Sequence, residues 1–252
     1  MGNEKERIMN TKRFAVLDGI RGFALLNMIV YHAVWDLVYL FGFHWRWYQS
    51  EIGYLWQQGI CWTFIFLSGF CQLLGHHRFK RGMIVFLAGL LITVVTGIFL
   101  PEEPVIFGVL TLLGSCMLLI LPLERIFNCC KPWTGFLTSM LLFILTRNIN
   151  LGYLGFENWN LLELPDHLYQ NLLTAYLGFP MAGFYSSDYF SLFPWLFLFT
   201  AGYFSYRILE KNDGLEWLVH GRMKALEWLG RHSLGIYLVH QPVLYGVLWV
   251  IF

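Results

Sequence analysis

Long apolar stretches separated by shorter polar segments run through most of the chain. A membrane-spanning helix needs about 20 mainly apolar residues, and seven stretches reach or approach that length. They cover 14–40, 53–75, 82–100, 105–121, 133–146, 190–206 and 233–252. The pattern therefore predicts an all-α fold, a polytopic membrane bundle of about seven transmembrane helices that forms a single domain over 1–252.

The basic residues indicate how the predicted bundle is oriented. With the N-terminus in the cytoplasm, all of the 17 lysine and arginine residues except Arg21, Arg46 and Arg147 fall in cytoplasmic segments. Arg21 lies inside the first span, and the other two lie outside. Because cytoplasmic loops of membrane proteins carry the excess of positive charge, we predict a cytoplasmic N-terminus and an external C-terminus.

Two longer polar segments are expected to fold. The external segment 147–189 is rich in aromatic residues, so we expect either a folded extracytoplasmic cover or an interfacial helix. In the second case 161–177 would lie along the membrane surface. The segment 213–230 spaces apolar residues between lysines and arginines. That spacing predicts a cytoplasmic amphipathic helix at the lipid headgroups.

Composition narrows the class of protein further. The chain is 57% hydrophobic and only 13% charged, whereas soluble domains carry about 25% charged residues. It is therefore expected to be a multi-pass integral membrane protein. No basic block with interleaved aromatics lies in a polar context, which argues against nucleic-acid binding. The five cysteines fit neither a disulfide framework nor a zinc pattern, and we predict no metal.

The first span carries four ionisable residues, Asp18, Arg21, His32 and Asp36, on one helix face. Arg21 and His32 are eleven residues apart, which is about 20° past three full turns and roughly 16 Å of rise. Charged side chains inside a bilayer usually face a bundle interior or a cavity. Asp36 can hold one ring nitrogen of His32 and leave the other as a base. The alternatives are an interhelical hydrogen bond from His32 and snorkelling of Arg21 beside Asp18.

The last span carries a second imidazole. His240 lies about 12 Å from the inner end of that span, at a depth similar to His32, and is followed by Gln241 and Pro242. Pro242 should kink the helix. A histidine here either lines a functional cavity or satisfies backbone that the proline frees.

Three further polar or aromatic positions are candidates. Ser68 and Gly69 form a small notch in the second span, which is also typical of close helix packing. Asp188 precedes the sixth span, where an acid commonly pairs with the helix dipole. Trp195 follows it closely.

These motifs resemble those of the transmembrane acyltransferase superfamily, and most closely its bacterial heparan-α-glucosaminide N-acetyltransferase-like branch. Acyltransferase family 3 is a more distant relative. The resemblance is carried by Arg21-Gly22 with His32 in the first span, by Phe64–Phe70 in the second, and by 190–202, 229–234 and 237–242 late in the chain. Thr111 departs from the pattern, since relatives often have a histidine there.

The resemblance implies a reaction and a site. Acyl-CoA, in the simplest case acetyl-CoA, would bind from the cytoplasm, and its acyl group would pass to a hydroxyl or amine of an extracytoplasmic sugar or glycan. The location implied is a bacterial-type plasma membrane, and a homodimer is compatible with it. The expected roles are catalysis by His32 and Asp36, donor binding by Arg21, Ser68, His240 and Gln241, and acceptor binding by Asp188 and Trp195.

Two other functions remain open from the sequence. A proton-coupled transporter could use His32, Asp36 and His240 as a relay, although the chain shows no inverted repeat of the kind common in transporters. A catalytically silent membrane binding protein could use the same scaffold.

Overall fold

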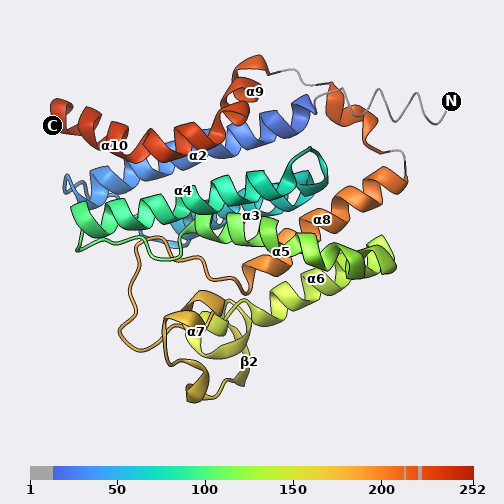
Figure 1. Cartoon of the computed structure of the whole chain (residues 1–252). Coiled ribbons are helices and arrows are strands. Elements are labelled where there is room, and N and C mark those ends of the chain that lie inside the picture. Colours follow the sequence, from blue (N-terminus) through green and yellow to red (C-terminus); the bar gives the residue numbers. More distant parts are fainter. Residues whose placement is uncertain (1–13, 213, 221–222) are drawn as a thin grey trace. The chain divides into compact units, whose positions relative to one another are not determined.

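The computed structural model describes residues 14–212, 214–220 and 223–252, and it consists mostly of helices (Figure 1). The basic residues Lys5, Arg7, Lys12, Arg13 and Arg222, which contributed to the predicted orientation, lie outside the described residues. The α-helices are α2 (Ala15–Tyr39), α3 (Glu51–Phe70), α4 (Arg78–Phe99), α5 (Val109–Cys129), α6 (Pro132–Thr146), α7 (Leu172–Leu177), α8 (Trp195–Lys211), α9 (Lys224–Arg231) and α10 (Ser233–Ile251).

Four of the described helices, α2, α4, α5 and α10, are long and apolar enough to cross a membrane. They correspond to the first, third, fourth and seventh predicted spans. The helices α6 and α8 have 15 and 17 residues, which is short of the usual length for a span. Helix α3 has 20 residues but carries the polar pair Gln57 and Gln58. The total of about seven spans and the orientation of the termini therefore stay predictions.

The chain divides into two compact units. The first combines both ends of the chain, Met1–Phe64 and Leu209–Phe252, and the second comprises Ile65–Ile208. In the first unit, α2 packs against both α9 and α10, and Figure 1 shows α10 running beside α2. In the second unit, α4 packs against α5, and α6 contacts the first strand of a small sheet.

Two glycines let α9 approach the backbone of α2. A Cβ atom at Gly22 would overlap the carbonyl oxygen of Leu226, and one at Gly230 would overlap the carbonyl oxygen of Asp18. Any other residue would separate the helices, because backbone atoms cannot move aside as a flexible side chain can. This crossing, which we call the Gly22–Gly230 contact, positions the start of α10 against α2.

The segment 147–189, which is predicted to lie outside the membrane, combines short strands, turns and one short helix. It contains an antiparallel hairpin, β1 (Tyr153–Phe156) and β2 (Trp159–Glu163), with an irregularity between Leu154 and Gly155. The 3₁₀ turns η2 (Ile149–Leu151) and η3 (Asp166–Leu168) and helix α7 complete it. The range 161–177 therefore does not form one helix, and its position along the membrane surface stays a prediction. Its first residues pair as β2, and α7 begins only after an Asn171 capping box.

The segment 213–230 is likewise not one helix. It contains the 3₁₀ turn η4 (Glu216–Val219) and the beginning of α9, while residues 213, 221 and 222 lie outside the described residues. His220, after η4, and Met223, before α9, both have non-helical backbone angles. A further 3₁₀ turn, η1 (Cys71–Leu73), follows α3.

Candidate functional site

Helices α2 and α10 bring together the polar residues that the sequence placed at similar depth. The ring centroids of His32 and His240 lie 5.0 Å apart. The Gln241 amide nitrogen donates a hydrogen bond of 2.7 Å to Oδ1 of Asp36. These four residues belong to the first unit, and we call them the α2–α10 cluster.

A backbone contact determines which nitrogen of the neutral His240 ring carries the hydrogen. Its Nδ1 lies 2.6 Å from the carbonyl oxygen of Tyr237, one turn earlier in α10. A carbonyl oxygen only accepts hydrogen bonds, so Nδ1 carries the hydrogen and Nε2 of the neutral ring carries a lone pair. Nε2 is buried and has no hydrogen-bond partner within the described part of the chain. The contact with Tyr237 therefore makes Nε2 the basic nitrogen of the neutral His240 ring.

The Asp36 carboxylate is fully buried, with 0% of its surface exposed. Its Oδ1 accepts from Gln241, while its Oδ2 finds no partner among the residues that the structure describes. The same holds for Oε1 of Gln241. The sequence predicted that Asp36 would hold His32, but the hydrogen bond that the structure shows joins Asp36 to Gln241.

His32 stands at the aromatic side of the cluster. Its ring is partly buried and makes an edge-to-face contact with Tyr31, with centroids 5.9 Å apart. Tyr31 in turn contacts the rings of Tyr48 and Trp56. Of the two ring contacts that His32 makes among the described residues, the one with His240 is the shorter.

Arg21 lies three turns away from the cluster on the same helix. Its guanidinium Nη1 is 3.2 Å from Oδ1 of Asp18, which agrees with the pairing expected from the sequence. Gly22 follows it at the contact with α9. Arg21 therefore lies at the end of α2 where α9 crosses, roughly 16 Å from His32 along the helix axis.

Ser68, which the sequence suggested for donor binding, lies in the second unit. It precedes Gly69, where a Cβ atom would overlap the carbonyl oxygen of Phe199, and Gly202 meets Phe66 in the same way. These contacts show that the Ser68–Gly69 notch is a place where α3 and α8 pack closely.

Asp188 also lies in the second unit, just before α8. Its Oδ2 accepts a 3.3 Å hydrogen bond from the backbone N–H of Val109, the first residue of α5. Burial raises the pKa of Asp188 to about 6, although this hydrogen bond opposes the shift. The carboxylate thus caps α5, as an acid at a helix N-terminus does.

Trp195, the first residue of α8, is 5% exposed. Its ring packs against those of Phe143 and Phe190 at centroid distances of 5.8 and 5.2 Å. The Arg147 guanidinium lies 5.0 Å from the centroid of the Trp195 ring, a cation–π geometry. These contacts make Trp195 part of the core of the second unit.

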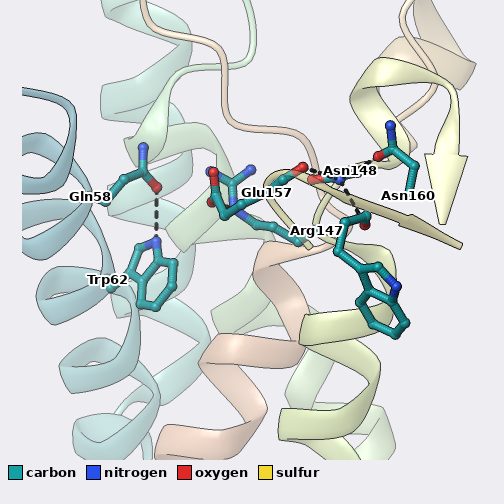
Figure 2. A network of polar contacts seen from close by, with 7 residues as sticks. Gln58, Trp62, Arg147, Asn148, Glu157 and Asn160 are labelled. Atoms are coloured by element: carbon teal, nitrogen blue, oxygen red, sulfur yellow. Dashed lines mark hydrogen bonds and ion pairs between the residues drawn. The ribbon is translucent and has the colours of Figure 1, made fainter. Parts of the chain in front are cut away.

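Arg147 also begins a polar network that the sequence analysis did not identify, and Figure 2 shows it. Its Nε is 3.2 Å from Oε1 of Glu157. The Asn148 amide nitrogen donates to the backbone oxygen of Glu157 at 2.7 Å and to Oδ1 of Asn160 at 2.9 Å. The network fixes the hairpin to the end of α6. Its only signal in the sequence is the polar Arg147-Asn148 pair directly after an apolar stretch.

Figure 2 also shows a hydrogen bond within α3, in the first unit, from the Trp62 indole to Oε1 of Gln58 at 2.9 Å. The bond gives the polar side chain of Gln58 a partner on its own helix.

In the described residues, no group of three or more His, Cys, Asp or Glu side chains is placed to hold a metal ion.

A comparison with known families decides the class of protein. Residues 13–242 match the family described as heparan-alpha-glucosaminide N-acetyltransferase, catalytic. The chain belongs to this family. No curated protein and no solved structure matches it. The resemblance found in the motifs is thereby confirmed, and the family identifies an acetyltransferase-type membrane enzyme. The matched region includes all four residues of the α2–α10 cluster.

Proposed function

We propose that this protein transfers an acyl group from cytoplasmic acyl-CoA to a hydroxyl or amine of an extracytoplasmic sugar or glycan. In this family the donor is acetyl-CoA. The observation that carries the proposal is the α2–α10 cluster, in which two imidazoles lie 5.0 Å apart beside a buried carboxylate. Three buried polar atoms there have no partner in the described chain, which is typical of a site that a ligand completes.

The residues of α2 support a path for the donor. Because cytoplasmic segments of membrane proteins carry the excess of lysine and arginine, we predict that the Arg21 end of α2 faces the cytoplasm. A guanidinium has five N–H donors, so Arg21 can keep Asp18 and still bind a phosphate of CoA. The thioester would then extend along α2 toward His32, and an intramembrane imidazole would accept the proton of the attacking nucleophile. The resemblance also implies that Ser68, His240 and Gln241 bind the donor and that Asp188 and Trp195 bind the acceptor. These roles stay predictions.

The experiment measures binding and transfer separately in purified protein in nanodiscs. Isothermal titration gives the Kd for acetyl-CoA, and radiolabelled acetyl-CoA gives transfer to an amino sugar or a sugar alcohol. We expect Arg21→Ala to weaken donor binding by about tenfold, the loss of one charge-assisted contact. Arg125→Ala is the matched control, because it removes an exposed arginine from the predicted cytoplasmic side. An absence of acetyl-CoA binding to the wild-type protein would refute the proposal.

The His32–His240 pair also favours a second candidate, a proton-coupled transporter, since adjacent imidazoles can relay protons. This function predicts substrate uptake into liposomes driven by a pH gradient without any CoA. Binding of acetyl-CoA with no transfer to any acceptor would instead indicate a silent binding protein.

A further inference from the structure

We infer that His240 is the catalytic base for the acceptor, and that Asp36 and Gln241 form the adjoining pair that holds the acceptor's hydrogen-bond donors. The inference rests on the proposed function and deepens it. It moves His240 and Gln241 from the donor-binding role that the resemblance implies to the acceptor side. It assigns the proton transfer to one atom, Nε2 of His240, and places His32 beside the reacting groups.

The first argument is the tautomer of His240. Because Tyr237 offers only an acceptor to Nδ1, at 2.6 Å, the lone pair of the neutral ring resides on Nε2. For His32 no comparable contact fixes which nitrogen carries the hydrogen, since its described contacts are the ring contacts with Tyr31 and His240. Of the two imidazoles, His240 is the one whose basic nitrogen is held in place before substrate binds.

The second argument is the chemistry of the unpaired atoms. The group of Gln241 that faces Oδ1 of Asp36 must be its NH₂, because a carboxylate only accepts. Its Oε1 is then left over, together with Oδ2 of Asp36 and Nε2 of His240, and all three are buried without a partner in the described structure. All three are acceptors. A ligand group that satisfies them must carry several O–H or N–H donors, as a polyol or amino sugar does and a thioester does not.

The third argument is the balance of the transfer step. The acceptor's O–H or N–H proton moves to Nε2 of His240, and its electron pair forms a bond to the thioester carbonyl carbon. The carbon–sulfur bond breaks, sulfur leaves with the electron pair as the CoA thiolate, and the imidazolium returns the proton to it. The Nδ1–H bond to Tyr237 persists throughout, so the ring keeps its orientation as its charge changes.

The test uses His240→Asn in the full-length protein. The asparagine amide nitrogen can still donate to the Tyr237 carbonyl, but the basic nitrogen is gone. We expect kcat for acetyl transfer to fall by about 100-fold or more, with the Kd for acetyl-CoA unchanged. His232→Asn is the matched control, because Nδ1 of His232 makes the same kind of contact, 2.9 Å from the Trp228 carbonyl, at an exposed position outside the cluster. It should transfer like the wild type.

A second variant tests the Asp36–Gln241 pair. Gln241→Met keeps the length of the side chain and removes both the donor and the acceptor. We expect it to raise the KM for the acceptor by about tenfold, the worth of one hydrogen bond, with the KM for acetyl-CoA unchanged. Gln170→Met, at an exposed position in the external segment, is the control.

The outcomes are distinguishable. If His240→Asn transfers at the wild-type rate while His32→Asn does not, His32 is the base and this inference fails, although the proposed function stands. If the wild type itself does not transfer, the proposed function fails. If His240→Asn does not fold, Gln241→Met decides: an acceptor KM equal to that of the wild type overturns the inference, and a raised one supports it.

Discussion

Removal of the Gln241 amide should destabilise the first unit because it isolates a buried carboxylate. In the native protein Gln241 is the hydrogen-bond partner of Asp36 at 2.7 Å, and the second carboxylate oxygen has none in the described residues. The change Gln241→Met therefore leaves Asp36, which is 0% exposed, with both oxygens unpaired.

The size of the effect follows from the type of bond. Hydrogen bonds between membrane helices average about 0.6 kcal/mol and reach about 1.7 kcal/mol, whereas those to charged groups contribute about 1.5–3 kcal/mol. Because Asp36 is fully buried, we expect a value nearer to that of a bond to a charged group. Gln241→Met should therefore lower the free energy of unfolding by ~2 kcal/mol. That is about a 30-fold change in the unfolding equilibrium constant.

A double-mutant cycle isolates this term. Asp36→Leu replaces the carboxylate by an apolar group of similar size, and in the combined variant with Gln241→Met no unpaired polar group is left at this contact. Replacing both partners can be nearly neutral, so the double variant should be more stable than Gln241→Met alone. Unfolding in mixed micelles with increasing denaturing detergent, followed by circular dichroism, gives the free energies, and Gln170→Met controls for the substitution. Additive single effects, with a coupling below ~0.5 kcal/mol, would refute the reasoning.

Three other changes have defined outcomes. Gly22→Ala should destabilise the protein by ~3 kcal/mol or more by forcing α9 from α2, whereas Gly235→Ala, with nothing within 4 Å of the added Cβ, should not; thermal unfolding with limited proteolysis compares them, and equal stabilities would contradict the close crossing. The pKa of Asp188 rises from 3.8 to about 6 on folding, so the unfolded state loses its proton first and wild-type stability should fall by up to ~3 kcal/mol as pH rises from 4 to 6; Asp188→Asn should remove that slope, and an unchanged slope would exclude Asp188 as its source. Arg147→Met removes an ion pair and a cation–π contact and should lower stability by ~1–2 kcal/mol; hydrogen exchange should increase in the β1–β2 hairpin first, and unchanged exchange there would show that Arg147 does not secure it.

The first span shows what a one-dimensional pattern can reveal. Helical spacing alone predicts that Asp18 lies beside Arg21 and that His32 and Asp36 lie one turn apart on one face, because both relations are local to one helix. The hydrogen-bond partner of Asp36 lies 205 positions later in the chain. Apolar periodicity predicts that a helix is buried but not which helix covers it, so the Gln241 contact needed the tertiary structure.

The segment 147–189 shows what such a pattern cannot reveal. Residues 161–163 are apolar or acidic and fit the edge of an amphipathic helix as well as they fit a strand. Residues 161–163 form a strand because they pair with 153–156 and because the Arg147–Asn148 network holds the hairpin in place. Neither interaction produces a periodic pattern in the sequence. The spacing in 213–230 likewise predicts one helix, because spacing does not reveal where the backbone leaves helical geometry.

The division of the first unit between the two ends of the chain has a consequence for biogenesis. Asp36 is synthesised 205 residues before Gln241, its hydrogen-bond partner on α10. Until α10 has been made, the Asp36 carboxylate lacks the hydrogen bond from the Gln241 amide. A product that stops before residue 209 would therefore contain the middle helices but lack the α10 half of the α2–α10 cluster. Coexpressing residues 209–252 as a separate peptide would show whether the two halves can find one another after synthesis.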